Sequence, residues 1–231
     1  ENWIYKHYVK IVCITPGVYQ SLHNKLAIDG NKLTVIENGI NLNGIYQSSA
    51  GIRAELGLTA MDRILIMVAG FREQKDQDTV IRVMRLLPDN YKLLLVGDGA
   101  RKEHLLKMVL SLGLVDRVIL LGIRSDVYSL LKMSDIAVLS SHWEGFGLAA
   151  AESMACGVPT IASNVPGLAE VINGGGLLFE KGDVTDLKQK ILQLENIDYY
   201  SEISIRGIEK SKLYSIDSMV DKLVNLYSTV F

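Results

Sequence analysis

Short apolar runs alternate with amphipathic stretches along most of the chain, and this alternation restricts the possible folds more than any other feature. Apolar runs with the length of buried strands occur at Ile11–Ile14, Leu33–Ile36, Ile64–Val68, Lys92–Val96, Val118–Leu121, Ile136–Leu139, Thr160–Ala162 and Gly176–Leu178. Helical patterns occur near Gly17–Ala27, Thr79–Leu87, Arg101–Leu112, Val127–Met133, Leu148–Cys156 and Leu168–Val171. Strands that alternate with helices predict an α/β fold: a doubly wound parallel sheet with helices on both faces.

The pattern changes along the chain and predicts three parts. Residues 1–40 are expected to form a linker or edge segment, and residues 41–182 the sheet domain. Residues 183–231 read as helices that pack on that domain, with Asp183 as an N-cap, over Val184–Leu194, Tyr199–Lys210 and Ile216–Val230. The chain begins at Glu1 with no signal-peptide pattern, so we expect it to be the interior part of a longer protein.

Composition excludes several classes of function. The chain is 48% hydrophobic and 22% charged, with a formal net charge of -2, so no general affinity for nucleic acid is expected. Cys13 and Cys156 lie in apolar surroundings and suggest neither a disulfide framework nor a metal site. No apolar run reaches the roughly 18 residues of a membrane span. We expect a cytoplasmic protein, with peripheral membrane association of the full-length protein as a further possibility.

The most informative segment for function follows the strand predicted at residues 136–139. It places two glutamates eight positions apart around a glycine turn and a predicted helix start, in the order Glu144, Gly145, Phe146, Gly147, Leu148, Ala149, Ala150, Ala151 and Glu152. Backbone N–H groups at a helix start bind anions, and glycines let a ligand approach the backbone. A phosphate flanked by carboxylates suggests a nucleotide sugar; the alternative is a capped helix with two solvated glutamates.

Two cations follow the strand predicted at residues 64–68. Because ligands bind at the carboxyl ends of parallel strands, Arg72 and Lys75 are expected to share a rim with the helix start at Gly147. Two cations and a helix N-terminus would form a diphosphate clamp. The alternative for both residues is a solvated loop with surface ion pairs.

Other catalytic motifs are missing or weak in the sequence. Gly97-Asp98-Gly99 opens like a dinucleotide fingerprint, but Lys102 stands at its last glycine position, so a tight turn is the better interpretation. No G-x-S-x-G, H-E-x-x-H or Walker A pattern occurs. His142 has no metal-ligand partner at useful spacing and is expected to be structural.

The segments resemble the donor-binding signature of the family 4 retaining glycosyltransferases, in order and spacing. The match is carried by Ser141–Leu148, Glu152–Ser163, Leu93–Gly99, Val118–Gly122, Gly167–Ile172 and, where the second domain begins, Val35–Ile40. It covers nearly the whole chain. The resemblance implies a GT-B architecture of two Rossmann-like domains, of which this chain is the second, with residues 41–182 as its nucleotide-sugar-binding part and the acceptor domain absent.

The resemblance also implies roles for particular residues in sugar transfer from a UDP- or GDP-sugar to an acceptor such as a glycan or lipid-linked sugar, without metal or other cofactor. Lys75 is then the phosphate lysine, and Glu152 binds the ribose hydroxyls. Glu144 is catalytic. Contacts to the donor sugar, diphosphate and base would come from Gly145, Phe146, Gly147, Leu148, Ile123 and Arg124.

The chain departs from the family pattern at two places. The family arginine after the first strand of the domain corresponds to Gly70, and Arg72 lies two residues further on; it is assigned as a candidate third catalytic residue. The family's Pro-Asn-Gly-Val-Asp reads Glu37-Asn38-Gly39-Ile40-Asn41, which predicts different hinge contacts.

Three other readings remain open at the level of sequence. The chain could bind a nucleotide sugar without turnover because the acceptor domain is missing. It could be a nucleotide-sugar epimerase with the same two-domain plan. Glu144 and Glu152 could also act as a glycoside hydrolase pair, although Arg72 and Lys75 favour a phosphorylated ligand.

Overall fold

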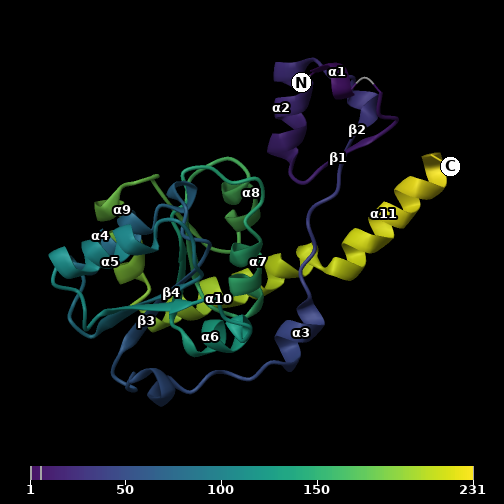
Figure 1. The fold of residues 1–231 in the computed structure, drawn as a ribbon. Coiled ribbons are helices and arrows are strands. Elements are labelled where there is room, and N and C mark those ends of the chain that lie inside the picture. The colour runs from purple at the N-terminus through teal and green to yellow at the C-terminus, as the bar shows by residue number, and fades with distance from the viewer. Residues whose placement is uncertain (1, 6, 231) are drawn as a thin grey trace.

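The computed structural model describes residues 2–5 and 7–230 (Figure 1). A small unit at the start of the chain contains α1 (Asn2–Tyr5), β1 (Ile11–Cys13), α2 (Pro16–Leu26) and β2 (Leu33–Val35). β1 and β2 pair in parallel as a separate two-stranded sheet and do not join the main sheet. Thr15 caps α2 by accepting a hydrogen bond from the Val18 amide at 3.2 Å. Residues 11–35 thus form a β-α-β unit.

The main body is a doubly wound parallel sheet, which confirms the predicted fold class. Its strands are β3 (Arg63–Val68), β4 (Tyr91–Val96), β5 (Val118–Gly122), β6 (Ile136–Leu139), β7 (Thr160–Ser163) and β8 (Leu177–Phe179). They lie in the order β5-β4-β3-β6-β7-β8, and all neighbours are parallel. The winding reverses between β3 and β6, and a crevice outside the carboxyl ends of the strands at such a switch point is the usual ligand site.

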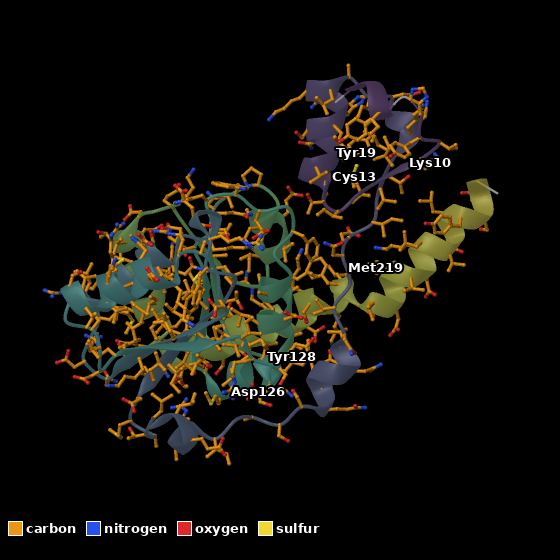
Figure 2. The ribbon with its side chains drawn as sticks, in the orientation of Figure 1. Lys10, Cys13, Tyr19, Asp126, Tyr128 and Met219 are labelled. Carbon is orange, nitrogen blue, oxygen red and sulfur yellow. The ribbon has the colours of Figure 1, made fainter. Side chains whose placement is uncertain are left out.

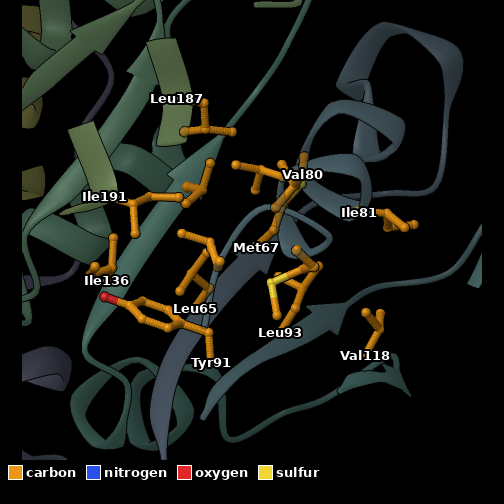
Figure 3. Close-up of a cluster of buried hydrophobic side chains, with 14 of the residues drawn as sticks. Leu65, Met67, Val80, Ile81, Tyr91, Leu93, Val118, Ile136, Leu187 and Ile191 are labelled. Atoms are coloured by element: carbon orange, nitrogen blue, oxygen red, sulfur yellow. The ribbon is translucent and has the colours of Figure 1, made fainter. Parts of the chain in front are cut away.

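Helices cover both faces of this sheet. They are α4 (Gln77–Met84), α5 (Lys102–Ser111), α6 (Val127–Met133), α7 (Leu148–Ala155), α8 (Leu168–Ile172) and α9 (Val184–Gln193). Leu65 and Met67 pack with α4, α5 and α9 on one face (Figure 3). Ile64 and Ile66 pack with α6 on the other. Strand side chains alternate in direction, so this continuous apolar run is buried on both sides, as in parallel sheets generally.

The C-terminal part is helical, as the sequence indicates. It contains α10 (Ile197–Ser211) and α11 (Ile216–Val230), joined by the 3₁₀ turn η4 (Lys212–Tyr214). Asp183 caps α9, accepting from the Thr185 and Asp186 amides at 2.8 and 3.0 Å. α11 extends from the main body toward the small unit (Figure 1), and a cavity of about 320 Å³ lies between residues 7–12 of that unit and the helix.

Two stretches of chain connect the small unit to the main body. The segment after β2 runs beside η4: Ile40 N–H donates to the Tyr214 carbonyl at 2.7 Å, and Ile216 N–H donates to the Ile40 carbonyl at 3.0 Å. Glu37, which stands where the family has proline, pairs with Lys222 of α11 at 2.9 Å. The changed hinge sequence therefore carries an ion pair between the two connecting segments.

Two helices were not expected from the sequence, the four-residue α1 and the longer α3. α3 (Leu42–Gln47) follows the hinge and is capped by Asn41, which accepts from the Gly44 amide at 2.9 Å. Its wholly buried Ile45 packs with the cluster under α7. The short 3₁₀ turns η1 (Gly30–Lys32), η2 (Arg53–Leu56) and η3 (Glu73–Lys75) complete the elements.

Candidate functional site

A cavity of about 310 Å³ opens at the carboxyl ends of β3 and β6, at the switch point of the sheet. It is lined by Ile14, Asn38, Val68, Lys75, Leu139 and the six residues from Glu144 to Ala149. Loops far apart in the sequence therefore meet here, as predicted for the rim of the sheet. The small unit and the hinge segment each contribute one wall residue.

Lys75 and Glu144 form an ion pair inside this cavity. Their side chains are 22% and 13% exposed, so solvent screens the pair only in part. The Ser141 hydroxyl lies 3.4 Å from the same Glu144 oxygen, Oε2, and the Gly145 amide donates to Oε1 at 3.3 Å. The Glu144 carboxylate is thus held by a cation and by donors of its own loop.

The two loops that carry this ion pair are bound to each other. Ser140, wholly buried, donates its hydroxyl proton to the Lys75 and Asp76 carbonyls at 3.0 and 2.7 Å. The His142 amide donates to the Gln74 carbonyl at 2.7 Å. These bonds fix Lys75 relative to the β6 loop, and the contacts of His142 are structural ones.

The glycine turn before α7 is required by close packing. Gly147 has φ +89°, and a Cβ there would lie 2.6 Å from Leu168 Cδ1. A Cβ on Gly167 would lie 2.3 Å from the Glu144 carbonyl oxygen. Phe146 is 3% exposed and packs edge-on against Tyr214, with ring centroids 5.2 Å apart. The first two amides of α7, those of Leu148 and Ala149, have no acceptor within the helix, and both residues line the cavity.

Arg72 does not line the cavity that holds Lys75. Its side chain lies beside Gly70: a Cβ built on Gly70 would be 3.7 Å from Arg72 Nε. Gln77, wholly buried, donates to the Gly70 carbonyl at 3.0 Å and fixes this turn. The Arg72 guanidinium thus lies next to the place where the Cβ of a side chain at position 70 would be.

Glu152 is not among the residues that line the cavity, and it lies about one helical turn beyond Leu148, the first residue of α7. Its Oε1 accepts a hydrogen bond from the Tyr128 hydroxyl at 3.2 Å. Burial raises the pKa of the Glu152 carboxyl, and the Tyr128 hydrogen bond offsets part of that rise. Burial and the nearby Glu152 charge raise the pKa of Tyr128 to about 12.

The loop after β5 also remains separate from the cavity. Ile123 is 82% exposed. Arg124 makes two bonds to the Asp126 carboxylate, at 2.8 and 2.7 Å. The structure therefore brings together Lys75, Glu144, Gly145, Phe146, Gly147 and Leu148 in one cavity. The lining of that cavity does not include Arg72, Glu152, Ile123 or Arg124.

Sequence reasoning did not assign Tyr128 to the site, nor the lining residues Ile14, Asn38, Val68, Leu139 and Ala149. Asn38 lines the cavity from the hinge, and its position in the hinge motif was the available signal. Tyr128 reaches Glu152 from α6, 24 residues earlier, and no spacing pattern indicates that contact. Among residues 2–5 and 7–230, no group of three or more His, Cys, Asp or Glu side chains is placed to hold a metal ion, and no helix has the length and apolar character needed to cross a membrane.

The chain belongs to the glycosyl transferases group 1 family, whose model matches residues 49–210. It is 37% identical over 185 residues to the N-acetyl-alpha-D-glucosaminyl L-malate synthase of Bacillus anthracis, covering 78% of this chain and 48% of that protein. It is 31% identical over 175 residues to a D-inositol 3-phosphate glycosyltransferase of Mycobacterium sp. (strain KMS), covering 72% and 39%.

Solved structures agree on the fold. Anabaena Alr3699/HepE in complex with UDP and glucose superposes with a TM-score of 0.91 at 22% identity, covering 99% of this chain and 65% of that one. Sucrose-phosphate synthase from Thermosynechococcus elongatus superposes with a TM-score of 0.88 at 25% identity, covering 100% and 60%. The chain thus has the Rossmann-like domain of GT-B glycosyltransferases and spans about half the length of the curated relatives it matches.

Proposed function

We propose that this chain is the donor-binding half of a retaining glycosyltransferase, which transfers a sugar from a nucleotide sugar to an acceptor bound by a further domain. The observation that carries the proposal is the meeting of Lys75, Glu144 and the α7 start in one cavity at the switch point of the sheet. Membership of the glycosyl transferases group 1 family supports it. So does the UDP held by a structure of the same fold.

The charges of the site match the charges that sugar transfer develops. When the leaving group departs, negative charge grows on the diphosphate and positive charge on the sugar. The Lys75 ammonium and the free amides of α7 stabilise the diphosphate, because preorganised donors in a partly desolvated site lower the barrier. The Glu144 carboxylate, beside Lys75, holds sugar hydroxyls or stabilises the positive charge.

We assign the phosphate role of the missing family arginine to Arg72. Its side chain lies against Gly70, the position that carries arginine in the family. Glu152 is assigned to the ribose hydroxyls, and the backbone at Ile123 and Arg124 to the base. UDP- and GDP-sugars are the expected donors, with no metal ion required.

Titration calorimetry of the chain with UDP-, GDP- and ADP-sugars tests donor binding. We expect saturable but weak binding of one class, because a second domain normally closes the cleft, and weaker binding by the Lys75→Gln variant. The matched control is Lys107→Gln, on the exposed side of α5. Absence of binding at millimolar ligand by a folded sample would reject the proposal.

A second candidate function is donor binding without sugar transfer by the chain on its own. The chain spans 48% of the length of the Bacillus anthracis synthase, so by itself it would bind the donor without transferring the sugar. Transfer assays on the chain alone and on its longer parent protein separate the two: turnover by the parent only is expected.

A further inference from the structure

The Glu152 carboxylate is a half-buried acid, and its side chain has a single hydrogen bond in the described part of the chain. That bond comes from the Tyr128 hydroxyl, at 3.2 Å from Oε1. A carboxylate without donors tends to lose its charge or to change rotamer when water is excluded. The partner on α6 therefore decides how Glu152 is presented.

Tyr128 itself is held firmly. It follows directly on Val127, the first residue of α6, and its ring packs against two apolar clusters at once. One cluster contains Ala150 and Ala151 of α7, and the other contains Leu131 of α6. Figure 2 shows Tyr128 near Asp126 at the start of the same helix. A ring fixed between two clusters gives its hydroxyl one stable direction.

We propose that Tyr128 is a positioning residue: its hydroxyl fixes the Glu152 carboxylate so that the second oxygen, Oε2, accepts hydrogen bonds from the ribose hydroxyls of the donor nucleotide. The proposal rests on the function proposed above. Tyr128 donates to one carboxylate oxygen and leaves the other to the ligand. It touches no reacting atom.

The chemistry of the contact supports these separate roles for the two carboxylate oxygens of Glu152. An ionised carboxylate only accepts hydrogen bonds, so the charged form of Glu152 can accept from the Tyr128 hydroxyl and from both ribose hydroxyls at once. Burial acts against the charge. The other ionisable groups near the contact are Cys156 and Lys132; Lys132 is already bonded to the Ile45 and Ser48 carbonyls at 2.6 Å. Tyr128 is thus the donor available to keep the carboxylate ionised and oriented.

The test compares two ligands that differ only in the ribose hydroxyls. Calorimetry measures binding of UDP and of 2′,3′-dideoxy-UDP to wild type and to Tyr128→Phe, with GDP and its dideoxy analogue as a second pair. We expect UDP affinity to fall about fivefold to tenfold, the effect of one lost hydrogen bond, and dideoxy-UDP affinity to stay unchanged. Tyr46→Phe, on exposed α3 surface, is the matched control and should change neither.

A second measurement distinguishes the positioning role of Tyr128 from a general loss of folded protein. In a Glu152→Gln background, Tyr128→Phe should cause no further loss of UDP affinity, because both changes act on one interaction. Unchanged UDP binding by Tyr128→Phe, equal losses for both ligands, or additive losses in the double variant would overturn the positioning role alone. If wild type binds neither UDP nor GDP, the proposed function fails, and this inference fails with it.

Discussion

Lys75 and Glu144, 69 residues apart in the sequence, form an ion pair at the point where the winding of the sheet reverses. One comes from the loop after β3 and the other from the loop after β6. The pair is held before any ligand arrives, because buried Ser140 ties the two loops together. Opposite charges fixed in advance need no reorganisation when charge develops on a bound ligand.

The first prediction concerns Lys75. In the full-length enzyme Lys75→Gln should lower kcat about a hundredfold, the usual effect of removing one preorganised charge. In the chain studied alone, UDP affinity should fall about tenfold or more, since a hydrogen bond to a charged group contributes about 1.5–3 kcal/mol. Steady-state kinetics and calorimetry measure the two effects. Lys107→Gln serves as the control, and wild-type affinity in Lys75→Gln would contradict the phosphate role.

The second prediction concerns the displaced arginine. Arg72→Gln should weaken UDP binding, and Gly70→Arg added to it should restore binding. The exchange is physically allowed: a Cβ at Gly70 meets nothing closer than 3.7 Å, and its backbone does not need the left-handed region. Calorimetry on the single and double variants measures the loss and the rescue.

The control for this exchange is Arg82→Gln. Arg82 is 56% exposed and pairs with Asp78 only at 3.9 Å, so its loss should leave UDP binding unchanged. If Arg72→Gln binds UDP as wild type does, Arg72 belongs to a solvated loop and the family arginine has no substitute.

Some features of the fold and the site could be predicted from the sequence and others could not, and the difference lies in the kind of contact that forms them. The strands and the rim loops could be predicted because apolar runs and glycine turns are local signals. Topology predicted that the Lys75 loop and the Glu144 loop share one rim, since the carboxyl ends of neighbouring parallel strands meet at one edge. The ion pair between Lys75 and Glu144 was not predicted and is a finding of the structure. In contrast, α3 was missed: its six residues include Gly44, and its burial of Ile45 depends on packing under α7.

Contacts between side chains of neighbouring helices were beyond sequence reasoning. Tyr128 meets Glu152 because α6 and α7 lie side by side, and rotamers decide the contact. The same applies to Arg72, whose direction depends on the turn that buried Gln77 fixes through the Gly70 carbonyl. The family resemblance implied roles for Glu152 and Arg72, but it did not indicate that Tyr128 contacts Glu152 or that Arg72 lies beside Gly70.

The third prediction is metal independence of the full-length enzyme. Asp76 and Asp78 are two apart, but both carboxylates are already engaged. Asp76 accepts the Thr79 hydroxyl at 2.6 Å, and Asp78 pairs with Arg101 at 2.9 Å. Lys75 and the α7 amides take the phosphate charge instead. Transfer rates measured in EDTA should equal those in Mg²⁺; loss of turnover in EDTA that Mn²⁺ or Mg²⁺ restores would refute this.

The fourth prediction concerns stability at the ribose site. Burial raises the pKa of Glu152, so the stability linked to its protonated form is present below the unfolded-state pKa and is lost as pH rises through the folded-state pKa. At pH 7–8 the ionised carboxylate therefore destabilises the fold. Glu152→Gln, which keeps an acceptor for Tyr128, should raise Tm by roughly 2–4 °C, the effect of about 1 kcal/mol in a chain of this size.

Calorimetric unfolding measured at several pH values checks whether Glu152→Gln raises or lowers Tm. The gain of Glu152→Gln should shrink as pH falls through the raised pKa of Glu152, because the wild-type carboxyl then takes up its proton. Glu202→Gln is the control, because Glu202 is exposed and pairs only with Arg206. A variant less stable than wild type at pH 8 would show that the buried charge is better compensated than its one hydrogen bond indicates.

The last prediction separates the two glutamates. Glu144 precedes the glycine turn and lies in the cavity beside Lys75, where the transferred sugar is expected. Glu152 lies further along α7, bonded to Tyr128 and outside that cavity. Glu152→Gln should therefore weaken UDP binding, by about 1.5–3 kcal/mol for a lost bond to a charged group. Glu144→Gln should leave UDP binding nearly unchanged and lower kcat in the full-length enzyme. If both variants bind UDP like wild type, the ribose role of Glu152 is wrong; if Glu144→Gln keeps full activity, Glu144 is an ordinary loop carboxylate that pairs with Lys75.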